Sequence, residues 1–138
     1  MGRQIDEEYI QNGKVRFGYW QLVFLGEGSK VSAEASECAG DQGVFWEYHD
    51  MIFDQVSGSF NQDTALALAN QLGLDLDVFE TCMETEKYGS LVLADTESAQ
   101  LLGVKSTPSF LINGQFLVGA QPYEAFDQII RAELEGQN

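Results

Sequence analysis

The chain has 138 residues, 44% of them hydrophobic, which is enough apolar material for one domain with an ordinary buried core. Acidic residues number 22 against seven basic ones, and the resulting formal charge of −15 argues against nucleic-acid and membrane-surface partners, since phosphates are repelled. The chain contains no run of about 18 apolar residues, so no membrane span is expected.

The first part of the chain is predicted to hold a helix end, one strand and a cluster of helices. Ile5 to Gln11 is typical of the last turns of a helix, because Asn12-Gly13 is a common helix C-terminal pair. Val15 to Leu22 is rich in β-prone residues and predicts a strand. Helical spacing and capping residues then predict helices over residues 29–39, 44–55, 63–72 and 75–85.

A hairpin is the clearest local signal in the second part of the chain. Asn113-Gly114 between apolar runs indicates a tight turn, since both central residues must accept positive φ. The hairpin strands are expected at Ser109–Ile112 and Gln115–Gly119. Thr107-Pro108 stands directly before the first strand, where a proline that lacks an N–H costs no ladder hydrogen bond.

One helix is expected before this hairpin and one after it. Asp95 or Thr96 can cap a helix that ends at Gly103. Pro122 suits the first turn of a last helix that runs to about Leu134. The order of elements predicts a mixed α/β fold with one parallel crossover and a terminal hairpin.

The cysteines limit the chemistry that the chain can perform. Cys38 and Cys82 lie on separate predicted helices and form no Cys-x-x-Cys pair, which a dithiol redox cycle needs. We therefore assign no catalytic residue. One histidine and two distant cysteines offer no ligand spacing, so neither a metal nor another cofactor is expected. From the residues alone, the two cysteines could be reactive thiols, buried thiols or a disulfide.

The helix predicted over residues 44–55 carries a histidine and several aromatic residues. His49 could act as a general base, but no nucleophile is identifiable near it, and a surface or boundary position is the simpler interpretation. The aromatic residues could line a ligand groove, although packing in the core explains them without a ligand; they are Phe45, Trp46, Tyr48 and Phe53.

Three blocks in chain order resemble the DsbA-like branch of the thioredoxin superfamily. They are Gly13–Phe17 leading to Leu25–Ser29, then Ala33–Ala39 followed by Gln42–Asp50, and last Gly103 through Thr107-Pro108 and Ile112-Asn113-Gly114 to Gly119–Tyr123. The resemblance implies an α/β thioredoxin-like fold in one domain, residues 1–138, with a helical insertion at about residues 29–102. It also implies an extracytoplasmic oxidoreductase acting on protein thiols, although Met1–Glu8 has no apolar core of a signal peptide.

The chain departs from this family at its active site. The family carries Cys-x-x-Cys at the start of the first core helix, whereas the match here begins at the tail of that helix. An N-terminally truncated fold without the central strand is therefore expected. In addition, Trp20-Gln21-Leu22-Val23 stands where the family usually has a basic residue and a proline.

A missing central strand would leave backbone groups of the neighbouring strands unpaired, at roughly 1–3 kcal/mol for each buried group. The flanking strands could close on each other, a second copy could supply pairing, or a separate N-terminal fragment could fill the space. We favour a homodimer, because exposed strand edges pair readily and a symmetric partner is always present.

The resemblance also assigns roles to particular residues. Relatives often carry a cysteine at the positions of both Cys38 and Cys82, which suggests a structural disulfide across the helical insertion. Ser106, Thr107 and Pro108 would form a cis-proline segment that presents backbone groups to extended peptides, unless this turn only shapes the sheet edge. The leading interpretation is a redox-inactive member of the oxidoreductase family. A non-catalytic peptide-binding or assembly module is the alternative, and a glutathione-linked or isomerase activity is the weakest of the three.

Overall fold

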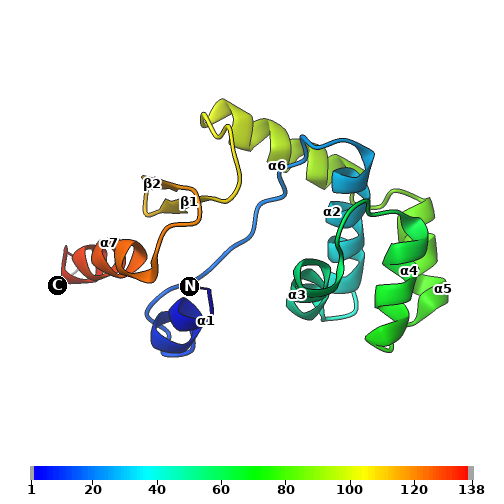
Figure 1. Ribbon diagram of the computed structural model, residues 1–138, viewed down its shortest axis with the longest axis horizontal. Coiled ribbons are helices and arrows are strands. Elements are labelled where there is room, and N and C mark those ends of the chain that lie inside the picture. The colour runs from blue at the N-terminus through cyan, green and yellow to red at the C-terminus, as the bar shows by residue number, and fades with distance from the viewer. Residues whose placement is uncertain (1, 137–138) are drawn as a thin grey trace. The chain divides into compact units, whose positions relative to one another are not determined.

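The computed structural model describes residues 2–136, which form two compact units. One unit, the helical unit, runs from Trp20 to Leu102, and the other, the terminal unit, joins the residues up to Tyr19 with those from Gly103 onward. Figure 1 shows the order of the elements along the chain. The expectation of one domain with an insertion at about residues 29–102 stays a prediction.

The helical unit contains α2 (Glu27–Gly40), α3 (Phe45–Gln55), α4 (Gln62–Gln71), α5 (Leu76–Glu84) and α6 (Gly89–Leu101). Two of these helices begin at a side-chain cap, since Asn61 accepts a hydrogen bond from the backbone N–H of Thr64 and Asp75 accepts one from Val78. The predicted helices at 63–72 and 75–85 therefore form within one or two residues of their expected bounds.

The core of the helical unit forms around α2, which supplies small buried residues to its neighbours. Ala35 and Ala39 are fully buried and allow α3, α4 and α5 to approach closely. Tyr48 and Phe79 fill the space between these helices, with ring centroids 5.8 Å apart. The Tyr48 hydroxyl donates to the carbonyl of Ala65 at 3.0 Å, so its buried polar group is satisfied.

The start of α6 corrects one prediction. Asp95 and Thr96 were expected to cap this helix, but it begins at Gly89 and both residues lie inside it. Their oxygens instead accept hydrogen bonds from the backbone of an extended segment: Asp95 Oδ2 from Gln21 N–H and Thr96 Oγ1 from Val23 N–H, each at 3.1 Å. Asp95 and Thr96 have side chains that can cap a helix, but here they accept hydrogen bonds from the extended segment and not from the first turn of α6.

The strand predicted at Val15–Leu22 is wrong, and so is the parallel crossover that it would begin. Residues 15–24 form no strand, and the sheet of the described residues contains only two antiparallel strands. β-prone composition favours a strand only when a neighbouring strand is available to pair with it. The backbone of Gln21 and Val23 bonds to side chains of α6 instead.

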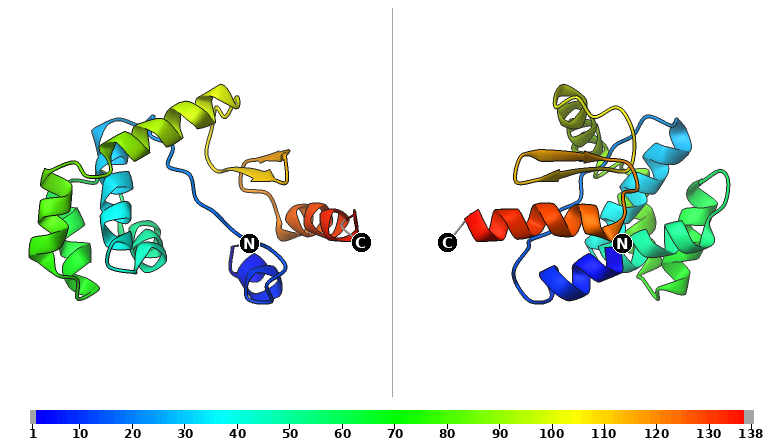
Figure 2. Two further views of the ribbon diagram at one scale, coloured as in Figure 1. Left: turned by 180° about the vertical axis from the view of Figure 1, so that it is seen from behind. Right: turned by 60° about the vertical axis from the view of Figure 1, so that its left-hand side comes forward.

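The terminal unit contains a hairpin of β1 (Ser109–Ile112) and β2 (Gln115–Val118), together with the last helix, α7 (Tyr123–Gly136). Asn113 and Gly114 have φ of 46° and 91°, the positive values that the tight turn requires. The hairpin lies along α7 in both views of Figure 2. Apolar side chains of one hairpin face pack there against buried Phe126 and Ile130.

The N-terminal part of this unit is helical but irregular. The helix expected at Ile5–Gln11 is divided between α1 (Gly2–Ile5) and a π-helical turn, η1 (Asp6–Ile10). Ile5 and Tyr9 are buried and join the apolar cluster of α7. This packing explains why a short helical segment is held in place, because isolated helices of this length are unstable in water.

Candidate functional site: a disulfide and the turn before β1

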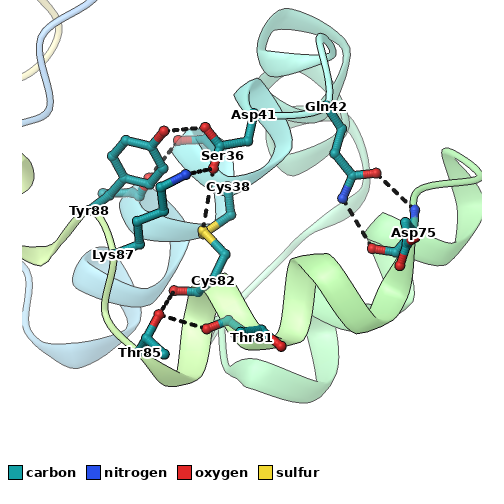
Figure 3. The surroundings of a disulfide bond; sticks show 11 residues. Ser36, Cys38, Asp41, Gln42, Asp75, Thr81, Cys82, Thr85, Lys87 and Tyr88 are labelled. Atoms are coloured by element: carbon teal, nitrogen blue, oxygen red, sulfur yellow. Dashed lines mark hydrogen bonds and ion pairs between the residues drawn. A yellow bond between two sulfur atoms is a disulfide. The ribbon is translucent and has the colours of Figure 1, made fainter.

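The two cysteines of the chain are bonded to each other in the helical unit (Figure 3). The disulfide joins Cys38 of α2 to Cys82 of α5 across a sequence separation of 44 residues. Cys38 is 1% exposed and Cys82 is 7% exposed. Neither thiol is free in this state, so neither can act as a nucleophile without prior reduction.

A carboxylate with two donors lies beside the disulfide. Asp41 Oδ2 is 4.0 Å from Cys82 Sγ and accepts a hydrogen bond from Lys87 Nζ at 2.5 Å, while the Tyr88 hydroxyl donates to Asp41 Oδ1. Figure 3 shows both donors directed at this carboxylate. The hydrogen bonds from Lys87 and Tyr88 hold the pKa of Asp41 below its usual value, so it is ionised at neutral pH.

A second contact fixes the same two helices. The side-chain amide of Gln42 donates to the carbonyl of Asp75 at 3.1 Å and accepts from the N–H of Asp75 at 2.8 Å. This pair of bonds ties the end of α2 to the start of α5. The disulfide is therefore one of several links between these helices.

A surface pocket of about 400 Å³ adjoins the disulfide. Its lining comes from the end of α2, from α5 and from the turn that follows α5: Asp41, Asp77, Val78, Thr81, Cys82, Thr85 and Lys87. Both cysteines belong to the apolar core cluster, but only Cys82 also borders this solvent-accessible space.

The turn predicted to bind peptides lies in the terminal unit and is described separately. Ser106, Thr107 and Pro108 are all exposed, and the Thr107–Pro108 peptide bond is cis. The Ser109 hydroxyl donates to the carbonyl of Ser106 at 2.6 Å, and the N–H of Gly119 donates to the carbonyl of Pro108 at 2.8 Å. These bonds attach the turn to the hairpin.

The edge of β1 next to this turn has no neighbouring strand within residues 2–136, because β1 pairs only with β2. The hairpin face that lacks α7 carries apolar side chains, with Leu111 opposite Phe116 in the register. These two side chains are 49% and 47% exposed. The turn therefore leads into a short strand with an open edge and an uncovered apolar face.

The aromatic residues of α3 have mixed positions. Tyr48 is fully buried, as core packing predicts, whereas Phe53 and Trp46 are 72% and 43% exposed, so the core interpretation is wrong for these two residues. His49 is partly exposed and lies 3.0 Å from Asp50 Oδ1, with the Phe53 ring at 4.9 Å.

Sequence reasoning missed a buried carboxylate on α2. Glu34 is 5% exposed, and its Oε1 has no hydrogen-bond partner. Its Oε2 lies 3.8 Å from Lys30 Nζ, and a Cβ added to Gly89 would meet Oε1 at 3.1 Å. Burial raises the pKa of Glu34, with Lys30 opposing the shift. The spacing of Lys30 and Glu34 would suggest a solvated ion pair, and nothing in the sequence indicates the close approach of Gly89.

A second cluster, in the terminal unit, was also not predicted. The Tyr9 hydroxyl and Arg131 Nε both donate to Asp127, and the Tyr123 hydroxyl donates to Glu8 at 2.6 Å. The bonds from Tyr9 and Arg131 keep the pKa of Asp127 low. The four-residue spacing of Asp127 and Arg131 could have indicated this pair, but the contacts with η1 could not be found from sequence.

No group of three or more histidine, cysteine or acidic side chains within residues 2–136 is arranged to hold a metal ion. No helix in the same range is both long and apolar enough to cross a bilayer.

Comparison with known proteins identifies the family. The sequence model of the thioredoxin family matches residues 1–132 of this chain. The chain belongs to the thioredoxin family. The chain is also similar to proteins named disulfide bond formation protein D, and it spans less than two thirds of their length. The predicted α/β thioredoxin-like fold with a helical insertion is thereby confirmed.

Three relatives illustrate the extent of the similarity. The Na(+)/H(+) antiporter NhaA 1 of Salinispora arenicola is 34% identical over 78% of this thioredoxin-family chain, which spans 16% of the antiporter. Disulfide bond formation protein D of Bacillus subtilis is 23% identical over 97% of the chain, which spans 64% of that protein. The crystal structure of oxidised BdbD from Bacillus subtilis superimposes with a TM-score of 0.84 at 23% identity and covers 96% of this chain and 76% of its own.

Proposed function

We propose that this DsbA-like chain is a redox-inactive scaffold, which does not itself catalyse dithiol–disulfide exchange on protein substrates. One observation carries the proposal: both cysteines are consumed in a single buried disulfide that joins two separate helices. A dithiol cycle needs two cysteines in neighbouring helical turns, one with a lowered pKa and one that resolves the mixed disulfide. The sequence contains no such pair.

The reduction of insulin by dithiothreitol, followed by turbidity, tests this proposal. Catalytic amounts of the chain should leave the time course unchanged, while a DsbA-type enzyme with Cys-x-x-Cys should shorten it. The Cys38→Ala/Cys82→Ala variant is the matched control. Acceleration by the wild type but not by this variant would show that the Cys38–Cys82 pair is catalytic and would overturn the proposal.

Binding of extended peptides is the second candidate function, and the open edge of β1 favours it. Ser106, Thr107 and Pro108 are exposed and lead directly into that edge, so an extended peptide could add its backbone hydrogen bonds there. The name of the Bacillus subtilis relative supports segments of thiol-containing proteins as the class of ligand. Titration with such peptides should shift the amide NMR signals of residues 106–111. Shifts confined to α7 would contradict this site.

A homodimer and an extracytoplasmic location complete the proposal. The unpaired edge of β1 supports self-association, because a second copy can supply the missing strand contacts. The disulfide supports an oxidising compartment, since reducing compartments keep most thiols unpaired. Light scattering at micromolar concentration should give twice the 15.3 kDa mass of the chain, and a monomeric mass would contradict the dimer.

A further inference from the structure

The two sulfur atoms of the disulfide lie in unequal surroundings. Cys82 lines the pocket of about 400 Å³, whereas Cys38 does not and is only 1% exposed. Both cysteines belong to the apolar cluster that contains Ala35, Ala39 and Tyr48, but only Cys82 also lines the pocket. A nucleophile that enters the pocket therefore meets only one of the two sulfurs.

We propose that Cys82 Sγ is a modification site, at which a small thiol entering the pocket attacks and opens the Cys38–Cys82 disulfide. The attacking thiolate forms a new S–S bond with Cys82 while the bond to Cys38 breaks, and Cys38 leaves as a thiolate that takes up a proton. A second small thiol then attacks the mixed disulfide. Two small thiols are thereby oxidised to a disulfide, and the two cysteines are reduced to thiols.

The burial of Cys82 limits the class of reductant. The pocket is a surface depression of about 400 Å³, which gives a small molecule room beside Cys82. Cys82 is 7% exposed, so a thiol carried on a folded protein surface cannot approach its sulfur without displacing neighbouring residues. The site is therefore selective for low-molecular-weight thiols.

Charge limits the reductant further. The Lys87 ammonium is paired with Asp41, and Asp77 adds a carboxylate to the lining that has no ion pair within residues 2–136. Of the 22 acidic residues, fifteen lie between Trp20 and Leu102, against only two of the seven basic ones. A thiol that carries a positive charge is attracted into this field, and an anionic thiol is repelled.

This inference is independent of the proposed redox-inactive scaffold, because it concerns stoichiometric reduction by a small thiol and not turnover of protein dithiols. Opening the disulfide removes the covalent link between α2 and α5. The Gln42–Asp75 contact and the Asp41–Lys87 pair would remain, so the helices stay associated but more weakly. The site is thus a redox-controlled link within the helical unit.

Three thiols of similar size test the charge preference on the wild-type chain: cysteamine, 2-mercaptoethanol and 2-mercaptoethanesulfonate, which are cationic, neutral and anionic. Reduction is followed by alkylation and mass spectrometry, and each rate is divided by the thiolate concentration. At low salt the cationic thiol should react about thirtyfold faster than the anionic one, because the two differ by two unit charges and each is worth about 1 kcal/mol near a carboxylate in water. Equal rates, or a faster anionic thiol, would overturn the proposal.

Low concentrations of urea show whether attack occurs in the folded state. Direct attack through the pocket should be first order in thiol and nearly independent of urea below the unfolding transition. A rate that rises steeply with urea would mean that the disulfide is reached only by unfolding, and would refute the site.

Variants locate the attack. Asp77→Asn should reduce the cysteamine preference severalfold, whereas Asp63→Asn should not, although both residues lie in the first turn of a helix in the same unit. In Cys38→Ser the thiol of Cys82 should react readily with a small disulfide, while the thiol of Cys38 in Cys82→Ser should be protected. Equal reactivity of the two thiols would overturn the assignment. If these cysteine variants do not fold, the wild-type rates and the comparison of Asp77→Asn with Asp63→Asn still test whether the thiol attacks Cys82.

Discussion

Reduction of the disulfide should lower the stability of the helical unit by an amount that the loop length sets. The cross-link closes a loop with a sequence separation of 44 residues, and the chain-entropy relation gives ~4 kcal/mol for a loop of this size. Small proteins have a net stability of only about 5–15 kcal/mol, so the reduced chain should be close to unfolding at physiological temperature. We expect its melting temperature to fall by roughly 10–15 °C.

Urea unfolding followed by far-ultraviolet circular dichroism, with and without a phosphine reductant, measures this effect. The oxidised and reduced chains differ by two hydrogen atoms, so the comparison isolates the cross-link from side-chain packing. The Cys38→Ala/Cys82→Ala variant should be insensitive to the reductant and serves as the control. A difference in unfolding free energy below about 1 kcal/mol would refute the loop-entropy reasoning and would mean that the noncovalent contacts alone hold α2 to α5.

Three further predictions concern polar groups. Glu34→Gln should stabilise the chain by about 1 kcal/mol at neutral pH, because the variant no longer buries a charged oxygen without a partner. Folding raises the pKa of Glu34, so the wild type loses stability as pH rises from the unfolded-state pKa through the higher folded-state pKa. The advantage of the variant should therefore grow as pH rises above about 4. An advantage that shrinks with rising pH in urea titrations would contradict the argument. Asp127→Asn should remove part of the loss of stability in acid. The pKa of Asp127 is lowered by folding, so its carboxylate contributes stability above its unfolded-state pKa, and this contribution disappears as pH falls through its folded-state pKa. Thermal melts at several acidic pH values measure this, and parallel curves for the wild type and the variant would be the contrary result. Gln21→Ala should lower the free energy of unfolding by about 1 kcal/mol, because it removes the side-chain amide hydrogen bonds to Ser36 and Glu37. Thermal unfolding measures this, and an unchanged melting temperature would show that those bonds add no stability.

Local signals were sufficient for most of the helices and for the hairpin. Asp75 starts a helix because its carboxylate binds an N–H three residues later, and this interaction depends only on nearby sequence. The same holds for Asn113-Gly114, where the turn residues fix the register of β1 and β2. Such features are encoded within a few residues and can be found without knowledge of the tertiary structure.

Predictions failed where distant residues compete for the same groups. Thr96 has the chemistry of a helix cap, but its hydroxyl bonds to the backbone of Val23, more than 70 residues away in sequence. Val15–Leu22 has the composition of a strand but has no neighbouring strand to pair with among the described residues. Local propensity cannot indicate whether such a partner is present.

The candidate site shows the same division between local and distant information. The family resemblance brought Cys38 and Cys82 together as a possible pair, but the pocket beside Cys82 arises from α5, its following turn and the end of α2. Nothing in the sequence indicates that Asp77 shares a pocket with a cysteine five residues later, and only the fold shows it. Glu34 was not singled out at all, because its burial depends on the approach of Gly89.

The contacts that stabilise the α2–α5 connection also set the electrostatic surroundings of Cys82. Lys87 is the one cation lining this pocket, and its pairing with Asp41 links the end of α2 to the turn after α5. The same pairing neutralises Lys87, so the negative charge of Asp77 dominates the field that an incoming thiolate meets. A variant such as Lys87→Met would then weaken the helix connection and leave Asp41 with the Tyr88 hydroxyl but without an ammonium partner. The repulsion of anions at the pocket would increase. The stability of this variant and its rate of reduction by anionic thiols should therefore both fall. Weaker structure alone predicts the opposite rate, because it would expose the disulfide and speed its reduction.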